Sequence, residues 1–420
     1  MLIQFRTSNS FSFKDTAELS MVASADKTHD NVNTFVRGGV KFLKSAVIYG
    51  ANGSGKTNLT NSFGYMRSLV LSHTDLRNVT FKLDKSCANK PSYFEVTFYN
   101  HDGLRCRYGF EVSEDRVIYE WLFHSKSSRE TKIFTREKNG VDMGRHGGKY
   151  VKDEPKNNQL LIALLANQKM QAAQDVVRWF KDVNLRSGLV SSHMSTLEKI
   201  NNGNKEDKKK VLDILHSFDI QMEDFIIKER PREPISTDGM EPAMASLVKA
   251  VNEFASTKEL GPQLDVFTVR KEYHDGKDIG TVELDLLENE SDGTKKLFEL
   301  ASYVVDALDV GGVLIIDELE SKLHPLVTKE LVCIFNSSDK NKNNAQLIFT
   351  THDTNLLRGG HLRRDQIWFT EKDKYGASHL YSLAEYKEKP RKDASLDKDY
   401  VKGRFGAIPF IGDFTELLKR

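Results

Sequence analysis

The residues Gly50–Thr57, which read Gly-Ala-Asn-Gly-Ser-Gly-Lys-Thr, have the types and the spacing of a loop that binds phosphate. Glycines let backbone N–H groups close around phosphate oxygens, and the helix start that follows offers unpaired donors and the positive end of a dipole. The plainer alternative is a glycine-rich turn, but the apolar run Ala46–Tyr49 before it supplies the expected strand. We expect Lys56 to reach the β- and γ-phosphates and the Thr57 hydroxyl to bind Mg²⁺. The predicted nucleotide contacts in this loop are Gly50, Asn52, Gly53, Ser54, Gly55, Lys56, Thr57 and Asn58.

A second apolar run, Gly312–Ile316, ends in the carboxylates Asp317 and Glu318. Such a run is typical of a buried parallel strand. We expect Asp317 to hold Mg²⁺ and Glu318 to orient or deprotonate the attacking water. Strands often end in acidic residues, so this interpretation depends on the phosphate loop upstream.

A third apolar run, Gln346–Thr351, ends at His352. Ligands bind open α/β sheets beside the carboxyl ends of the strands, so a histidine there can contact a γ-phosphate. A single histidine is more often structural. We nevertheless name His352, with Glu318, as a candidate catalytic residue.

The rest of the pattern indicates the elements that position these residues. Residues 1–49 alternate in short apolar and polar runs and predict edge strands that lead into the phosphate-loop strand. The helix after Thr57 has one apolar stripe, which predicts a buried face. Three runs between residues 80 and 137 predict an antiparallel meander, because turn residues separate them: Phe94–Tyr99, Arg107–Val112 and Val117–Phe123.

Residues 155–260 have mostly helical patterns, and the charged run Lys205–Lys210 favours a solvated helix start over a nucleic-acid patch. Strands return at Phe267–Arg270 and Thr281–Leu286, where we expect the second half of the nucleotide fold to begin. The fold class is therefore α/β, a P-loop ATPase head with a β-subdomain and a helical insertion. The expected segments are an N-terminal ATPase lobe (1–79), an antiparallel β-subdomain (80–154), a helical insertion (155–264) and a C-terminal ATPase lobe (265–420).

Composition sets few limits on function. The net charge of +1 provides no overall basic field for nucleic acid, although a local basic patch is compatible with it. The three cysteines are widely spaced and lack a metal-binding pattern. No run approaches the ~18 apolar residues of a membrane span, and no secretory signal is evident. We expect a cytoplasmic protein without a membrane partner.

The order of these motifs resembles the ABC-type ATPase heads of the SMC and RecF class. Within that class, Ser291–Thr294, the Asp-Glu-x-x-x-x-Leu-His-Pro pattern of Asp317–Pro325 and Phe349–Asp353 are similar to AAA-type ATP-binding proteins of phage-defence operons. These include RloA and the ATPase half of OLD nucleases. The closing run Gly403–Pro409 is also similar to the RloA type.

The resemblance implies roles for further residues. Ser291, Gly293 and Thr294 stand where ABC ATPases have their signature, as a second phosphate cradle at a helix start. In the family this cradle closes on ATP held by another subunit, which implies a head-to-tail homodimer or a larger homo-oligomer. Ser321–His324 would be the D-loop and His352 the switch histidine. Leu-Ser-Gly-Gly-Gln is absent, and no Q-loop glutamine is located; Gln159 is a weak candidate that we do not count.

Two functions are compatible with the sequence. The first is an Mg²⁺-dependent ATPase that acts as sensor or scaffold for a separate toxin or nuclease in an abortive-infection system. The second is a RecF-like or SMC-like ATPase that clamps DNA during repair. An OLD-type nuclease is disfavoured, because the carboxylates after His352 are too few and too close for a second catalytic domain: Asp365, Glu371 and Asp373.

Overall fold

The structure is a computed structural model of the 420-residue chain. It describes residues 1–72, 76–126, 129–138, 140–144, 155–188, 205–230, 236–256, 263–386 and 395–409. The chain divides into two compact units: unit 1 comprises Met1–Val190 and Asp306–Arg420, and unit 2 comprises Ser191–Val305. In the part of the chain that is described, no helix has the length and apolar character needed to cross a membrane.

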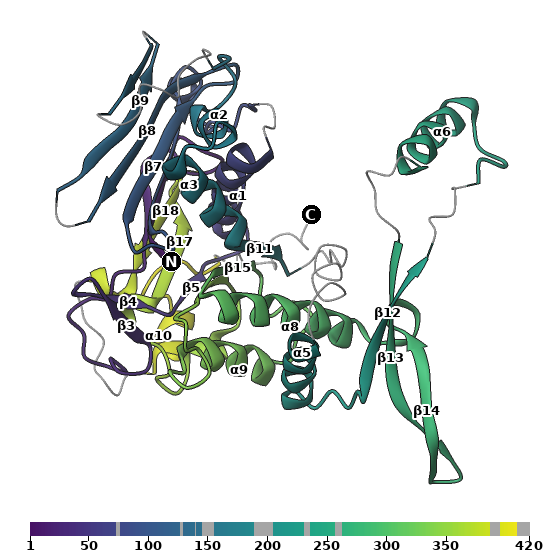
Figure 1. The fold of residues 1–420 in the computed structure, drawn as a ribbon. Coiled ribbons are helices and arrows are strands. Elements are labelled where there is room, and N and C mark those ends of the chain that lie inside the picture. Colours follow the sequence, from purple (N-terminus) through teal and green to yellow (C-terminus); the bar gives the residue numbers. More distant parts are fainter. Residues whose placement is uncertain are drawn as a thin grey trace, which may run out of the picture. The chain divides into compact units, whose positions relative to one another are not determined.

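A six-stranded sheet runs through unit 1 in the order β11-β15-β16-β5-β17-β18 (Figure 1). The first five strands are parallel to one another, and β18 is an antiparallel edge strand. Every residue of β5, β15 and β16 is buried, as their continuous apolar runs predict. The bounds are β5 Ser45–Tyr49, β11 Val183–Ser187, β15 Val313–Asp317, β16 Gln346–Thr350, β17 Ile367–Lys372 and β18 Ser378–Ser382.

Helices follow two of these strands. Helix α1 (Lys56–Ser72) starts directly after the phosphate loop and buries the predicted apolar stripe of Leu59, Phe63, Met66, Leu69 and Val70. Helix α9 (Pro325–Asn336) starts after β15, with His324 as its N-cap. The His324 ring accepts from the Leu326 N–H at 3.2 Å, and proline is favourable at the first helical position because its missing N–H has no intrahelical partner there.

A second, antiparallel sheet of unit 1 has the order β10-β9-β8-β7-β6-β1-β2. Strands β6 to β10 pair consecutively, which confirms the predicted meander. Because β1 also pairs with β6, the first two strands and the meander form one sheet, whereas β3 and β4 form a separate two-stranded sheet. The bounds are β1 Leu2–Ser8, β2 Ala17–Ser20, β6 Ser92–Tyr99, β7 Arg105–Val112, β8 Val117–Ser125, β9 Thr131–Glu137 and β10 Gly140–Met143.

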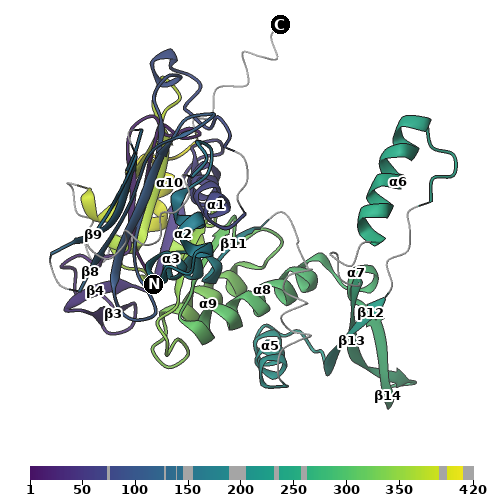
Figure 2. The same ribbon diagram turned by 45° about the horizontal axis from the view of Figure 1, so that its top comes forward.

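Three helices pack on this antiparallel sheet: α1, α2 (Leu161–Asn167) and α3 (Gln171–Asp182) (Figure 2). The rings of Phe98 and Trp179 stack with centroids 4.3 Å apart, and those of Phe5 and Phe63 meet edge to face at 5.1 Å. A single hydrophobic cluster joins both sheets to these helices. Smaller elements of unit 1 are β3 Thr34–Arg37, β4 Val40–Leu43, α10 Leu396–Val401 and the 3₁₀ turns η1 Lys85–Cys87, η2 Thr354–Leu357, η3 Arg364–Gln366 and η4 Leu383–Glu385.

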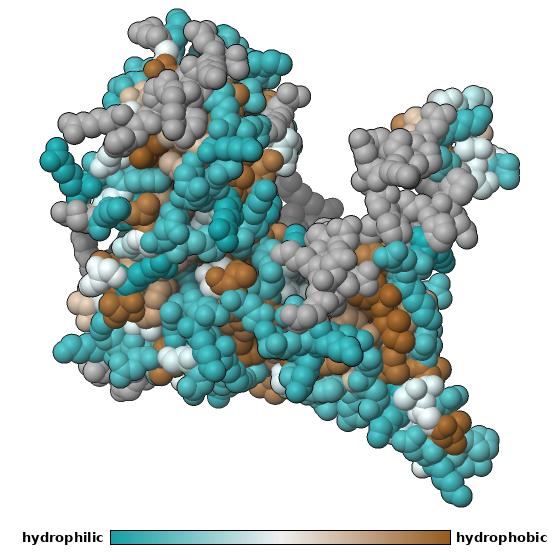
Figure 3. Space-filling model, in the orientation of Figure 1, coloured by the Kyte–Doolittle hydropathy of each residue, from teal (hydrophilic) through white to brown (hydrophobic). Residues whose placement is uncertain are grey.

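Unit 2 is organised around a three-stranded antiparallel sheet in the order β12-β13-β14. Its elements are α5 Lys205–Ser217, β12 Asp224–Arg230, α6 Pro242–Ser256, β13 Gln263–His274, β14 Lys277–Asp285 and α7 Leu286–Asn289. Helix α8 (Asp292–Val310) starts in unit 2, and its last five residues belong to unit 1. Unit 2 has several exposed apolar side chains, among them Met244, Leu247, Val251, Tyr273 and Ile279. Figure 3 shows one face of this unit coloured by hydropathy.

The structure divides the chain differently from the four expected segments. The strand expected at Phe267–Arg270 lies within β13, and the one expected at Thr281–Leu286 lies in β14 except for Leu286, which starts α7. Both strands belong to the sheet with β12 and not to the parallel sheet. The segment 155–264 is not one helical insertion, because α2, α3 and β11 pack in unit 1 whereas α5, β12 and α6 belong to unit 2. The physical reason is that an apolar helix stripe or a strand pattern predicts which side chains are buried, but not which sheet or unit the element packs against.

Candidate nucleotide-binding and active site

The predicted phosphate loop lies between β5 and α1, at the carboxyl edge of the parallel sheet. Gly53 has φ +74° and Gly55 has φ +119°, conformations that favour glycine. A Cβ on Gly55 would lie 2.3 Å from the Ser378 hydroxyl, whereas a Cβ on Gly53 would meet no atom within 4 Å. Gly55 is therefore required on two grounds, and Gly53 on backbone conformation alone.

Hydroxyl groups of residues on β17 and β18 form hydrogen bonds to the phosphate loop. The hydroxyls of Ser54 and Thr370 lie 2.7 Å apart, and Ser378 donates to the Ser54 carbonyl at 2.6 Å. The sequence analysis missed both supports, because no local pattern links these strands to the loop. Ser54, Gly55 and Lys56 are buried while Asn52, Gly53 and Thr57 are exposed, so one face of the loop is open to a ligand.

Lys56 is the buried cation of the site. Its ammonium donates to the carbonyls of Gly50 at 2.9 Å and Ala51 at 3.2 Å. Burial lowers the pKa of the Lys56 ammonium, and three nearby carboxylates oppose that shift: Asp317, Glu318 and Glu320. The two predicted carboxylates and that of Glu320 thus lie close enough to Lys56 to stabilise its positive charge.

Thr350 connects the two predicted carboxylate residues. Its hydroxyl donates to Asp317 Oδ1 at 2.6 Å and accepts from the Glu318 N–H at 2.8 Å. Glu318 has φ +55°, a left-handed conformation that costs a non-glycine residue about 1–3 kcal/mol and is often found at active sites. A Cβ on Gly188 would lie 1.9 Å from the Glu318 carbonyl oxygen, so glycine is needed beside this turn.

His352 follows β16 at the same edge of the sheet. Its backbone N–H donates to Glu320 Oε1 at 2.6 Å. Partial desolvation lowers the pKa of His352, and the charge of Lys56 acts in the same direction, which favours the neutral imidazole. The sequence analysis did not name Glu320, although an acid three residues after Asp317 was a signal that could have identified it.

These residues fit a nucleotide with Mg²⁺. The loop has an open face with glycines and a buried lysine beside it, as phosphate requires. Magnesium usually binds one or two carboxylates and keeps several waters, and Asp317 with the Thr57 hydroxyl supplies ligands of that kind. Asn58, the next residue of α1, uses its carbonyl to accept from the Ser62 hydroxyl at 2.8 Å.

The residues expected from the family resemblance lie in both units. The signature residues are in unit 2, where the Ser291 hydroxyl accepts from the Thr294 N–H at 3.2 Å and lies 3.0 Å from the Thr294 hydroxyl. Gly293 belongs to the first turn of α8. Ser321–His324 form the turn before α9, with Lys322 at φ +62°. The Gln159 carbonyl accepts from Arg136 on β9, so this residue belongs to the surroundings of the antiparallel sheet.

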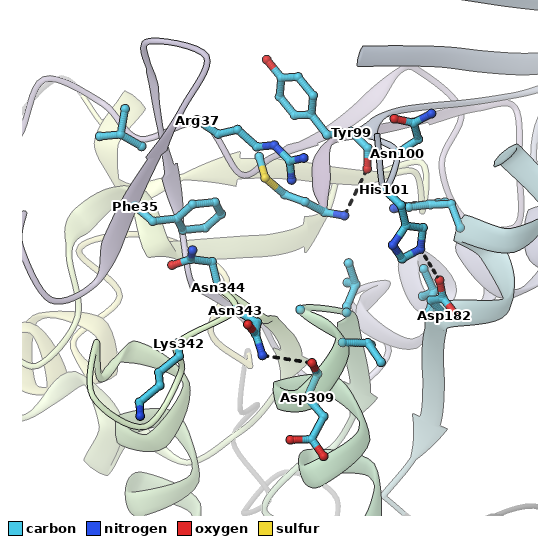
Figure 4. A pocket seen from close by; sticks show the side chains of 18 residues that line it. Phe35, Arg37, Tyr99, Asn100, His101, Asp182, Asp309, Lys342, Asn343 and Asn344 are labelled. Carbon is cyan, nitrogen blue, oxygen red and sulfur yellow. Dashed lines mark hydrogen bonds and ion pairs between the residues drawn. The ribbon is translucent and has the colours of Figure 1, made fainter. Parts of the chain in front are cut away.

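Unit 1 also has a cavity of about 500 Å³ at the amino edge of the parallel sheet (Figure 4). Val183 and Val313, the first residues of β11 and β15, line it. A hydrogen bond of 2.7 Å joins the His101 ring to the Asp182 carboxylate on its wall. Because Asp317 lies at the other end of β15, this cavity is distinct from the phosphate loop.

The chain was compared with curated proteins and with solved structures. No curated protein matches the chain. Among solved structures, the SMC head domain from Thermotoga maritima is 12% identical, with 91% of this chain and 98% of that chain covered and a TM-score of 0.39. The recombination mediator protein RecF-ATPrS is 13% identical, with 90% and 98% covered and a TM-score of 0.36.

The family comparison is more informative. A family model described as "AAA domain, putative AbiEii toxin, Type IV TA system" matches residues 45–358. That range starts at β5 and includes the phosphate loop, β15, β16 and His352. It covers well over half of the chain, and the chain therefore belongs to this family of AAA domains.

Proposed function

We propose that the protein binds and hydrolyses ATP with Mg²⁺ at the carboxyl edge of the parallel sheet. The observation that carries this proposal is the grouping of Lys56 with Asp317, Glu318 and His352 around the loop Gly50–Thr57. The charges of Asp317 and Glu318 act on the pKa of both Lys56 and His352, and ionisable groups perturbed in this way are typical of functional sites.

The proposed mechanism assigns a task to each residue. Backbone N–H groups of the loop and the Lys56 ammonium bind the phosphates of ATP. Asp317 and the Thr57 hydroxyl would hold Mg²⁺, which would neutralise charge on the phosphate oxygens when bound. Glu318 accepts a proton from the attacking water, and the neutral His352 contacts the γ-phosphate.

We further propose that two chains form head-to-tail ATP sites. The support is the hydrogen-bonded Ser291–Thr294 turn at the start of α8, a 19-residue helix with an N-terminus suited to an anion. Ser291, Gly293 and Thr294 of one chain would contact the γ-phosphate bound by the other chain.

The output of this ATPase is proposed to be control of a separate toxin or nuclease effector in anti-phage defence. The family description, which names a toxin of a type IV toxin–antitoxin system, supports this context. ATP turnover without a second reaction acts through conformational change that another molecule senses. Unit 2 is the proposed docking region for the effector, because it exposes apolar residues such as Leu247 and Val251 on α6.

Two variants test the ATPase. Lys56→Ala should abolish ATP binding, and Glu318→Gln should keep binding while phosphate release falls at least a hundredfold. Wild-type turnover in Glu318→Gln would contradict the assignment of the general base.

Co-purification from cells that express the whole operon tests the effector. We expect a companion protein to be retained by the wild type and lost from Leu247→Glu/Val251→Glu, with ATP hydrolysis unchanged. Tight, salt-sensitive DNA binding without a companion would instead indicate a DNA-clamping ATPase.

A further inference from the structure

We propose that Tyr49 and Glu320 are positioning residues that together fix the loop carrying His352. This inference rests on the proposed ATPase. The two side chains hold adjacent residues: Glu320 Oε1 accepts from the His352 N–H at 2.6 Å, and the Tyr49 hydroxyl donates to the Asp353 carbonyl at 3.0 Å. One support comes from β5, directly before the phosphate loop, and the other from the turn after β15.

Tyr49 is a rigid support. Its ring is fully buried against Phe369, with centroids 6.3 Å apart, and against Tyr400 at 5.5 Å. Burial keeps the pKa of its hydroxyl well above the ordinary value, so the group remains a donor. Because Tyr49 immediately precedes Gly50, its hydroxyl ties the His352 loop to the start of the phosphate loop.

The C-terminal run Gly403–Pro409 braces this tyrosine. Tyr400 packs on the Tyr49 ring and donates to the Ala407 carbonyl at 3.0 Å. The Ala407 N–H donates to Glu371 on β17 at 2.9 Å. The ring of Phe405 stacks on Phe369 with centroids 5.8 Å apart. This run, for which the sequence indicated no role, thus completes the wall behind Tyr49.

The two carboxylate oxygens of Glu320 differ in their hydrogen bonding. One of its carboxylate oxygens binds the His352 N–H, and the other is buried without a hydrogen-bond partner among the described residues. A buried polar atom without a partner destabilises the fold, so stability alone does not explain this carboxylate. Holding the His352 loop at a defined position does explain it.

The consequence concerns the rate of hydrolysis and not the affinity for ATP. Misplacing a group that contacts the reacting phosphate by about 1 Å can cost roughly a hundredfold in rate. The phosphate loop binds ATP without these two side chains, so loosening the His352 loop should leave nucleotide affinity nearly unchanged. Tyr49 and Glu320 should therefore affect kcat and should do so only through His352.

The experiment measures kcat and KM of the full chain by phosphate release. Tyr49→Phe and Glu320→Ala are made in the wild type and in His352→Ala. Each should lower kcat by about tenfold with KM within about twofold, and neither should lower it further when His352 is absent. Glu320→Gln keeps an acceptor oxygen and should restore most of the rate. Tyr65→Phe is the matched control, since it also removes the hydroxyl of a buried tyrosine that donates to a backbone carbonyl, here that of Arg77, and its kcat should equal that of the wild type.

Hydrogen exchange of the peptide containing His352 provides a second measurement that does not require turnover. Exchange should accelerate in Tyr49→Phe and in Glu320→Ala, but not in Tyr65→Phe. Unchanged exchange, or losses in kcat that persist fully in His352→Ala, would overturn the inference while leaving the ATPase intact. A wild type that neither binds nor hydrolyses ATP would contradict the proposed function itself.

Discussion

Replacement of Thr350 by valine tests how the active-site turn is built. The side chain of Thr350 is fully buried, and its hydroxyl makes two hydrogen bonds, one to Asp317 and one from the Glu318 N–H. Valine has nearly the same shape, so Thr350→Val removes these bonds without creating a cavity. Thr350→Ser is the matched variant, because it keeps the hydroxyl and removes only a methyl group.

The expected loss follows from these two bonds. A hydrogen bond to a charged group contributes about 1.5–3 kcal/mol, and an N–H left without its partner costs about 1–3 kcal/mol. Glu318 is only partly buried, which favours the lower end for its N–H. We therefore expect Thr350→Val to lower the free energy of unfolding by about 3 kcal/mol. Thr350→Ser should lose only about 1 kcal/mol, the value of one buried methyl group.

Urea unfolding followed by tryptophan fluorescence measures this difference, because all three tryptophans lie in unit 1: Trp121, Trp179 and Trp368. The same variant should lower kcat for ATP by roughly tenfold or more, since Glu318 loses the bond that holds its left-handed backbone beside Asp317. Equal stability of the valine and serine variants, together with a wild-type kcat, would refute this account of the turn.

Three further predictions follow from other parts of the structure. Gly55→Ala should abolish ATP binding and destabilise unit 1 more than Gly53→Ala in the same urea assay, because only the Gly55 Cβ would meet Ser378; equal losses would contradict the close approach. Ser291→Arg should prevent the dimer that ATP induces in Glu318→Gln, with molecular mass measured by light scattering. A dimer that persists in the arginine variant would show that Ser291–Thr294 do not lie at the interface. Glu120→Ala should destabilise unit 1 by about 3 kcal/mol, because the buried carboxylate accepts from Tyr108 and from the Leu161 and Ile162 N–H groups at the start of α2, and its KM for ATP should not change.

The central strands and the phosphate loop could be predicted from the sequence because their signals are local. Two continuous apolar runs, Ala46–Tyr49 and Gly312–Ile316, predict strands that are buried on both faces. The first is followed by the glycine-rich loop and the second by two carboxylates. Helix α1 was also predictable, since its stripe has the period of one buried face.

The remaining structure depends on contacts between distant segments. Strand β13 has an ordinary strand pattern, and nothing in Phe267–Arg270 specifies β12 as its partner. The roles of Thr350 and Glu320 arise from hydrogen bonds across β15 and β16, more than 30 residues apart in sequence. Spacing along the chain does not encode such pairs, whereas the parallel sheet brings them together.

The position of β5 in the sheet has a consequence for synthesis of the protein. Its hydrogen-bonded neighbours are β16 and β17, which begin at Gln346 and Ile367. A ribosome therefore produces the phosphate loop about 300 residues before it produces the strands on either side. At about 5–20 residues per second, the nascent chain waits tens of seconds in a state that cannot close around a nucleotide. On the proposed function, a nascent chain thus becomes able to respond to ATP only after β17 has been made, and a message interrupted before Ile367 yields fragments that are silent toward ATP.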